Sequence, residues 1–282
     1  MSNPLGEVFG FPITNVSERA ERYRSHKLCP YNNVLPNCTK DKQSNPLGVC
    51  SMHHRHSTVI TCPVRFREDW LILDDVYKFF FEEDENWTSL GEVKIKDASG
   101  KAAGNIDYVL VTYDKRGRIT NFASLEVQAV YVTGNIRDPF EAYMDNPTPA
   151  FEWTGGFNYP KPDYLSSSRK RLAPQLLSKG GIFNQWGKKQ AVVLQTLLYD
   201  TLPPLTEVEE SKATLAWFLY DLVPNENGTD LQLTLNRVVY TMFESALVQF
   251  TTFQAGDKAD FVHILQSKLD EKLAGTNPAT RI

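Results

Sequence analysis

Two carboxylates and an amide on neighbouring strand-like segments are the side chains best placed to do chemistry. Asp107 lies in the segment at residues 105–113, and Glu126 and Gln128 lie in the segment at residues 119–130. Residues two apart on a strand face the same side of a sheet, so Glu126 and Gln128 share a face. Hairpin pairing of the two segments places Asp107 next to Glu126. Oxygen ligands that converge in this way suit Mg²⁺, so the sequence predicts a metal-dependent phosphodiesterase centre.

The predicted roles follow from what phosphodiester hydrolysis requires. A metal ion activates the attacking water and neutralises the charge that develops on the phosphate. We expect Asp107 and Glu126 to bind the metal, with Glu92 as a further carboxylate that could bring in a second ion. Gln128 would position the water by hydrogen bonding, because an amide is no base at neutral pH. The apolar neighbours of Glu126 favour a functional site over a solvated strand face, since an idle buried charge is costly.

All cysteines of the chain lie in one short N-terminal window. They are Cys29, Cys38, Cys50 and Cys62. In a reducing compartment such clustering indicates a metal site, and four thiolates can close a tetrahedral site for Zn or Fe. None of the spacings is a CxxC knuckle, and three nearby histidines could compete as ligands, namely His53, His54 and His56.

Two other readings of the cysteines stay open. A secreted protein could pair them in two disulfides, and the motifs beginning at Asn37, Asn86 and Asn227 would then be potential glycosylation sites. The cysteines could also be free thiols. We expect a cytoplasmic, bacterial protein, because the N-terminus lacks a basic region followed by an apolar stretch and no apolar run reaches the roughly 18 residues of a membrane span.

The charge of the chain is unevenly distributed. The net charge is −4, from 30 Lys and Arg against 34 Asp and Glu. Basic residues gather at residues 19–67 and 161–189, whereas acids gather at residues 82–85 and 207–210. A local basic face on an acidic protein suits a polyanion such as DNA, and a solvated surface is the alternative. The candidate DNA-binding residues are Arg169, Lys170, Arg171, Lys179, Lys188 and Lys189.

Apolar periodicity and turn residues predict the elements that must hold these side chains. The apolar fraction of 41% and the charged fraction of 23% are those of an ordinary globular protein. We expect helices at residues 68–81, 183–199, 238–250 and 260–273, and strands at residues 93–95, 106–112, 119–130, 214–223 and 231–235. Residues 138–162 are expected to form an ordered loop. This order predicts an α/β (α+β) fold with a mixed central sheet flanked by helices.

The predicted boundary between the two parts of the chain lies near residue 67. Residues 1–67 are rich in turn residues and contain little that could form a core, so we expect a loop-rich four-cysteine metal-binding module that needs its metal to fold. Residues 68–282 would form the catalytic domain, with residues 161–189 as its DNA-binding basic segment.

The combination of motifs resembles the NotI family of type II restriction endonucleases, a branch of the PD-(D/E)XK nucleases. The matching segments are residues 28–30, 48–50 and 61–63 around the cysteines, residues 91–95, 105–108 and 125–128 around the acids, and residues 217–222 and 231–236 in later strands. The resemblance implies a restriction-endonuclease-like core and Mg²⁺-dependent double-strand cutting at a specific, palindromic, GC-rich DNA site. It also implies a homodimer, iron or zinc at the four cysteines, and a companion DNA methyltransferase.

Two alternatives to a restriction enzyme remain open from the sequence. One is a DNA-binding protein that keeps a structural metal and has an inert nuclease-like core. The other is a nuclease for repair or RNA processing, with the same site but a structure-selective or nonspecific activity.

Overall fold

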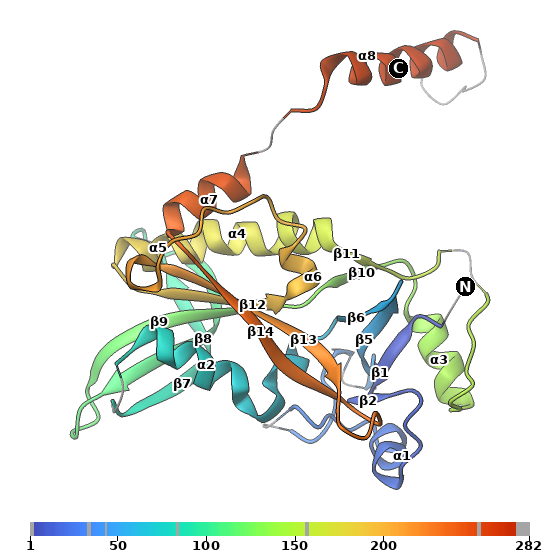
Figure 1. The fold of residues 1–282 in the computed structure, drawn as a ribbon, viewed down its shortest axis with the longest axis horizontal. Helices are drawn as coiled ribbons and strands as arrows, with labels where there is room; N and C mark the ends of the chain where they lie inside the picture. Colours follow the sequence, from blue (N-terminus) through green and yellow to red (C-terminus); the bar gives the residue numbers. More distant parts are fainter. Residues whose placement is uncertain are drawn as a thin grey trace.

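A six-stranded mixed sheet forms the centre of the protein (Figure 1). The computed structural model describes residues 3–32, 35–42, 44–82, 85–155, 158–252 and 255–274. The strand order is β14-β13-β12-β9-β8-β7. Helices cover both faces of this sheet, which confirms the mixed α+β architecture expected from the sequence.

The first half of the sheet is an antiparallel meander. It contains β7 (Trp87–Lys96), β8 (Ala102–Tyr113) and β9 (Ile119–Gln128), joined in chain order. The tight turn between β8 and β9 includes Gly117 at φ 75°, a conformation that glycine adopts without strain. The strands β8 and β9 lie where the sequence predicted them, because β-rich runs on either side of a glycine turn are local signals, whereas β7 begins six residues before the predicted strand.

In the second half of the sheet, one strand replaces a predicted helix. The helix expected at residues 183–199 is wrong in its centre, where β12 (Gln190–Gln195) runs parallel to β9 and β13 (Leu215–Pro224). All six residues of β12 are buried, and a strand covered on both faces has no alternation to distinguish it from a buried helix. The edge strand β14 (Leu231–Thr241) extends beyond the strand predicted at residues 231–235. The helix α7 (Phe243–Thr251) therefore begins later than the helix predicted at residues 238–250.

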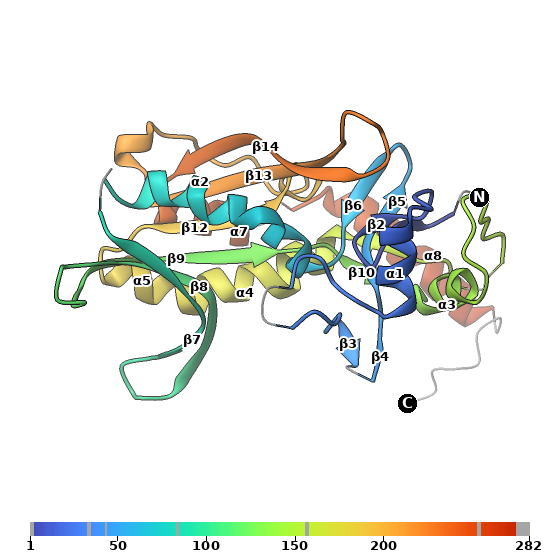
Figure 2. The same cartoon turned by 90° about the horizontal axis from the view of Figure 1, so that it is seen from below.

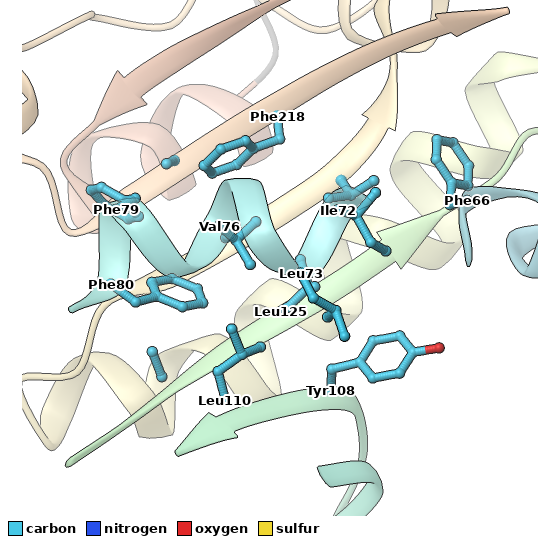
Figure 3. Packing of buried hydrophobic residues seen from close by; sticks show 14 of the residues in the cluster. Phe66, Ile72, Leu73, Val76, Phe79, Phe80, Tyr108, Leu110, Leu125 and Phe218 are labelled. Atoms are coloured by element: carbon cyan, nitrogen blue, oxygen red, sulfur yellow. The ribbon is translucent and has the colours of Figure 1, made fainter. Parts of the chain in front are cut away.

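One face of the sheet is covered by the predicted helix at residues 68–81. The helix α2 spans Leu71–Phe80, and a 3₁₀ segment at Pro63–Trp70, with non-helical backbone at Glu68 and Asp69, precedes it. Ile72, Val76 and Phe79 point from α2 toward the sheet (Figure 3). They pack in one cluster with Leu125 of β9 and Phe218 of β13, all of them buried. The apolar stripe of α2 therefore anchors the helix over the strands that carry the acids.

The opposite face is covered by a helical stretch at residues 166–185 that the sequence reading did not predict (Figure 2). The stretch runs through Ser166–Leu172, α4 (Ala173–Gln175), Leu176–Gly180 and α5 (Gly181–Gln185), with wider π-helical turns in the first and third parts. Its apolar side chains join a buried cluster with β12, β13 and α7. The short helix α6 (Thr196–Tyr199) closes this layer after β12.

The N-terminal region contains short strands and a buried core as well as loops. A four-stranded sheet has the order β2-β1-β5-β6, and Leu5, Val8 and Phe9 pack in a buried cluster with Phe140 and Tyr143 of the expected loop at residues 138–162. The sequence does not predict this core, because the strands are short and the core forms only through contacts between residues that lie far apart in the chain. The N-terminal elements are β1 (Leu5–Val8), β2 (Phe11–Pro12), α1 (Glu18–Ser25), β3 (Asp41–Lys42), β4 (Asn45–Pro46), β5 (Val49–His54) and β6 (Ser57–Ile60). The later segment that contains Phe140 and Tyr143 consists of β10 (Tyr131–Thr133), α3 (Arg137–Asp145) and β11 (Lys161–Asp163).

A buried arginine connects this region to the large sheet. The Arg65 guanidinium donates to Glu7 Oε1 at 3.0 Å and to Glu68 Oε2 at 2.8 Å, and both Arg65 and Glu7 have side chains with no exposed surface. It also donates to the Leu231 carbonyl oxygen at 2.9 Å and lies over the Tyr31 ring. One side chain thus ties β1 and β14 to the 3₁₀ segment that precedes α2.

The last helix, α8 (Lys258–Leu273), stands away from the body of the protein (Figure 1). It begins at the predicted place and carries the predicted apolar residues, including Phe261, Leu265 and Leu269. Every residue of α8 is exposed, and its large apolar side chains are between 47% and 76% exposed. Among the helices that the structure describes, none is long and apolar enough to cross a membrane.

Candidate active site

The β8–β9 hairpin brings the predicted acids together. Tyr108 pairs with Leu125, so the next positions along the two antiparallel strands, Asp107 and Glu126, stand opposite each other. Asp107 Oδ2 accepts a hydrogen bond of 2.8 Å from the Val127 backbone N–H. This bond fixes the Asp107 carboxylate against β9, as the predicted register requires.

Glu126 is buried and is held by a lysine from the helical layer. Lys179 Nζ donates to Glu126 Oε2 at 2.7 Å, and the two side chains are only 7% and 8% exposed. The same ammonium donates to the backbone oxygen of Asn105 at 2.7 Å. Glu126 Oε1 is buried without a hydrogen-bond partner. A buried carboxylate oxygen with no donor is suited to a cation.

Burial and like charge perturb both carboxyl groups. Burial raises the pKa of the Asp107 carboxyl, although the Val127 N–H and the Lys179 ammonium oppose this. Burial raises the pKa of Glu126 to about 8, the Asp107 charge adds to the increase, and Lys179 lowers it. The pair therefore retains a proton at neutral pH unless a cation displaces it. Perturbed carboxylates beside a cavity are typical of functional sites.

Gln128 and Glu92 complete the set of predicted catalytic residues. The Gln128 side chain is largely buried, and its Nε2 donates to the Ala129 backbone oxygen at 2.6 Å. Glu92 is exposed on β7, where its φ of 52° is unusual for a residue other than glycine. Asn105 Nδ2 donates weakly to Glu92 Oε2 at 3.5 Å. Both residues line the same cavity as Asp107.

This cavity has a volume of about 470 Å³ and opens beside the hairpin. Asp107, Glu92 and Gln128 line it. Arg67, from the 3₁₀ turn before α2, and the pair Lys170 and Arg171 from the helical stretch bring positive charge to its walls. The Arg171 guanidinium lies 4.3 Å from the centre of the Tyr131 ring. A cavity lined by both acids and cations can hold a metal ion and a phosphate together.

The predicted DNA-binding residues do not form one face. Lys179 is not a surface residue but part of the buried site, because its ammonium neutralises Glu126. Lys188 Nζ donates to Asn121 Oδ1 and Lys189 Nζ donates to the Phe79 carbonyl oxygen, both at 2.7 Å. Arg169 lines a separate groove near α7. Of the other basic residues proposed from the sequence, Lys170 and Arg171 line the same cavity as Asp107.

The four cysteines line one small cavity together with Lys40 and Val64. All four are free thiols, so the disulfide alternative is not found. Burial raises the pKa of Cys29 to about 11 and also raises the pKa of Cys38 and Cys50. Within the described part of the chain, no group of three or more His, Cys, Asp or Glu side chains is arranged to hold a metal ion. The expected iron or zinc site is therefore not formed as a ligand cluster here.

The functional residue that sequence reasoning placed wrongly is Lys179. It lies 53 residues after Glu126 in the chain, and no short motif links them. The π-helical turn at Leu176–Gly180 directs Lys179 inward, although its neighbours Leu177 and Ser178 are exposed. The sequence signal for burial of Lys179 is its position among apolar residues of the helical stretch at residues 166–185, and this stretch was not predicted.

A comparison with protein families identifies the class of protein. The six-stranded mixed sheet flanked by helices is consistent with a nuclease fold. The family model of restriction endonuclease NotI matches residues 8–233, most of the chain. The protein therefore belongs to the NotI restriction endonuclease family, which confirms the resemblance noted from the sequence and makes it a DNA endonuclease. No curated protein matches the chain.

Proposed function

We propose that this restriction endonuclease cuts both strands of DNA at a specific, palindromic and GC-rich site in a Mg²⁺-dependent reaction. The observation that carries the proposal is the pairing of Asp107, which lines a cavity together with Arg67, Lys170 and Arg171, with Glu126, whose Oε1 is buried without a hydrogen-bond donor. Two like charges at close range with an unpartnered oxygen fit a divalent ion, because a cation satisfies both.

The residues divide the work as follows. Asp107 and Glu126 would hold Mg²⁺, and Glu92 at the cavity edge would add a carboxylate for the same or a second ion. The metal supplies an activated water and neutralises charge on the scissile phosphate. The Gln128 amide lines the cavity and would orient that water. Lys170 and Arg171 would bind the DNA phosphates on either side of the cut.

The remaining basic residues extend the proposed DNA contact. Lys188 and Lys189 are partly buried, with their ammonium groups bound to Asn121 and Phe79, and Arg169 is exposed. We propose that they meet phosphates farther from the cut. A palindromic site would be read by a homodimer, because two-fold symmetry in the DNA matches two-fold symmetry in the protein. A companion methyltransferase would protect the host DNA.

The direct test is digestion of unmethylated, GC-rich DNA by the full chain with Mg²⁺. We expect discrete fragments that disappear with EDTA and with Asp107→Asn. The asparagine can still accept from the Val127 N–H, so the fold is retained while the metal ligand is lost. Asp114→Asn is the matched control, because Asp114 lies in the turn of the same hairpin and its Asn replacement keeps the turn acceptor.

Three outcomes would contradict the proposal. A smear instead of fragments would indicate a structure-selective or nonspecific nuclease. Fragments that persist in EDTA would remove the metal from the mechanism. DNA binding without cutting on many substrates would favour a binding protein with an inert core.

We also propose that Cys29, Cys38, Cys50 and Cys62 bind iron or zinc by moving together around the cavity that they share. Metal binding would expel the thiol protons that burial now retains. Elemental analysis of the purified protein should find about one Fe or Zn per chain, lost in Cys50→Ser. Protein that is folded and cuts DNA without either metal would contradict this assignment.

A further inference from the structure

A tyrosine hydroxyl at the cavity is buried and lacks a hydrogen-bond partner. Tyr108 follows Asp107 on β8 and lines the same cavity, yet it is only 7% exposed. Within the described part of the chain, its hydroxyl has neither a donor nor an acceptor. The ring packs in the apolar cluster, and the hydroxyl points away from the other labelled side chains (Figure 3). A hydroxyl removed from water is costly unless something binds it, so this one indicates a ligand.

The cation beside this tyrosine is Arg67. Its guanidinium carbon lies 5.7 Å from the centre of the Tyr108 ring, and it lines the cavity as well. Among the described residues, no carboxylate forms an ion pair with Arg67. Burial raises the pKa of Tyr108, although the Arg67 charge opposes this, so the hydroxyl keeps its proton at neutral pH. A guanidinium and a protonated hydroxyl side by side are two donors for one anion.

A strained turn holds the two donors together. Asp69 and Trp70 have φ of 47° and 57°, in the left-handed region that is unfavourable for residues other than glycine. Glu68 fixes one end of the turn, because its carboxylate accepts hydrogen bonds from a buried arginine and from the β14 backbone. At the other end the Trp70 ring stands edge-on to Tyr108, with 5.9 Å between the ring centres. The surrounding contacts therefore maintain the strain, as they do at binding sites, and keep Arg67 beside Tyr108.

Arg67 lines two cavities, and this decides which anion fits. The second cavity has a volume of about 630 Å³ and is also lined by Arg19 and Gln232, whereas Asp107 and Glu92 line only the first. Every nucleotide of a DNA strand carries a phosphate, so a strand that is cut beside Asp107 brings neighbouring phosphates with it. A donor shared by the two cavities fits such a neighbour better than the phosphate that is cut.

We propose that Arg67 and Tyr108 bind the backbone phosphate next to the scissile one. The inference rests on the proposed function and deepens it. Arg67 donates its N–H groups to the nonbridging oxygens of this phosphate, and the Tyr108 hydroxyl donates to the same group. The phosphate thus gives the buried hydroxyl its missing acceptor. It also fixes the strand, so that the adjoining phosphodiester lies beside Asp107.

Neutral phosphates in the DNA test this contact one position at a time. Fluorescent duplexes with the cut site found by digestion carry a methylphosphonate at one of the phosphates that flank the cut. Their dissociation constants are measured by anisotropy in Ca²⁺, after confirming that Ca²⁺ leaves the duplex intact. We expect one position at which the wild-type protein loses about tenfold or more in affinity. Arg67→Met should bind the unmodified duplex about tenfold less tightly and should lose less than about threefold more at that position, because both changes remove the same contact.

Tyr108→Phe separates the hydrogen bond from the charge. It should weaken binding of the unmodified duplex by about fivefold and should also reduce the methylphosphonate effect. The slope of log affinity against log salt should stay unchanged in Tyr108→Phe and should fall by about one in Arg67→Met. The melting temperature of Tyr108→Phe should equal or exceed that of wild type, because the change removes a hydroxyl that has no partner in the free protein.

Two controls match these variants. Tyr77→Phe removes a hydroxyl that donates to the Glu82 backbone oxygen outside the cavity. Lys212→Met removes the lysine of an exposed ion pair with Glu209, also outside the cavity. Both controls should keep the wild-type methylphosphonate pattern. Arg67→Gln replaces the methionine variant if that variant fails to fold.

The outcomes distinguish this inference from the proposed function. If no methylphosphonate beside the cut weakens wild-type binding, the phosphate contact is overturned, even if the protein cuts DNA. A full methylphosphonate effect in folded Arg67→Met and Tyr108→Phe overturns it as well. A lower melting temperature of Tyr108→Phe with unchanged DNA binding would make the hydroxyl structural. Wild-type protein that neither binds nor cuts DNA fails at the earlier digestion test, and the inference falls with the proposed function.

Discussion

At the scale of single residues, the same chemistry appears in two buried ion pairs with different surroundings. Glu126 and Lys179 lie next to Asp107, which lines the cavity, and one oxygen of Glu126 lacks a donor. Glu7 and Arg65 lie away from that cavity, and the arginine has partners on three sides. Full satisfaction of its hydrogen bonds indicates a structural role for Arg65, whereas the unsatisfied oxygen of Glu126 indicates a ligand.

Replacement of Arg65 should therefore reduce stability more than any exposed charge does. Arg65→Met leaves the Glu7 carboxylate buried without its cation, which costs about 3–5 kcal/mol. Urea denaturation measures the loss, and Lys212→Met, from an exposed pair, should cost less than about 1 kcal/mol. Glu7→Leu combined with Arg65→Met should recover part of the loss. Equal effects of Arg65→Met and Lys212→Met would show that the buried pair is not a tie between the two sheets.

At the scale of elements, β7 carries its candidate ligand in a strained conformation. Glu92 has a φ of 52° in the middle of the strand, between Gly91, paired with Tyr108, and Val93, paired with Ile106. A left-handed conformation costs a residue other than glycine roughly 1–2 kcal/mol. Strain of this kind is common at functional sites, where the surrounding structure imposes it.

Glu92→Gly should separate this strain from the role of the carboxylate. We expect stability that is unchanged or higher by about 1 kcal/mol, because glycine relieves the left-handed conformation, together with slower cleavage. Lys94→Gly, at an exposed position of the same strand, should instead lose about 0.5–1 kcal/mol. The measurements are urea denaturation and initial cleavage rates. Destabilisation of both variants to the same extent would argue against strain at Glu92.

At the scale of the whole molecule, positive charge gathers around the cavity of a protein whose net charge is −4. Phosphate contacts release counterions, so DNA affinity should fall steeply with salt. Arg171→Ala should lower the slope of log affinity against log salt by about one, because the Tyr131 ring holds its guanidinium at the cavity. Binding titrations over a range of NaCl measure the slope. An unchanged slope would place Arg171 outside the DNA contact.

Removal of α8 tests whether the body of the protein folds without it. None of the described residues of α8 is buried, so deletion of residues 253–282 should leave the melting temperature within about 2 °C of wild type. Thermal denaturation followed by circular dichroism measures this. A matched deletion that also removes α7, which buries Phe243 and Phe250, should lower the melting temperature strongly. A large loss on removing α8 alone would show that the helix packs on something in solution.

The sequence by itself determined the chemistry and the local elements that carry it. Asp107, Glu126 and Gln128 follow from strand alternation and a glycine turn, and α2 follows from its apolar periodicity, because these signals act over a few residues. The clustering of cysteines was visible for the same reason, although the metal remains a proposal.

Tertiary structure decided the rest. A strand buried on both faces, as β12 is, looks like a helix until its neighbours in the sheet are known. The N-terminal core forms only when residues more than a hundred positions apart meet, as Phe9 and Phe140 do. Lys179 was read as a surface charge because long-range packing alone brings it to Glu126. The burial and hydrogen-bond partners of a side chain depend on the whole fold. They place Lys179 against Glu126, whereas the sequence predicted that it contacts DNA phosphates.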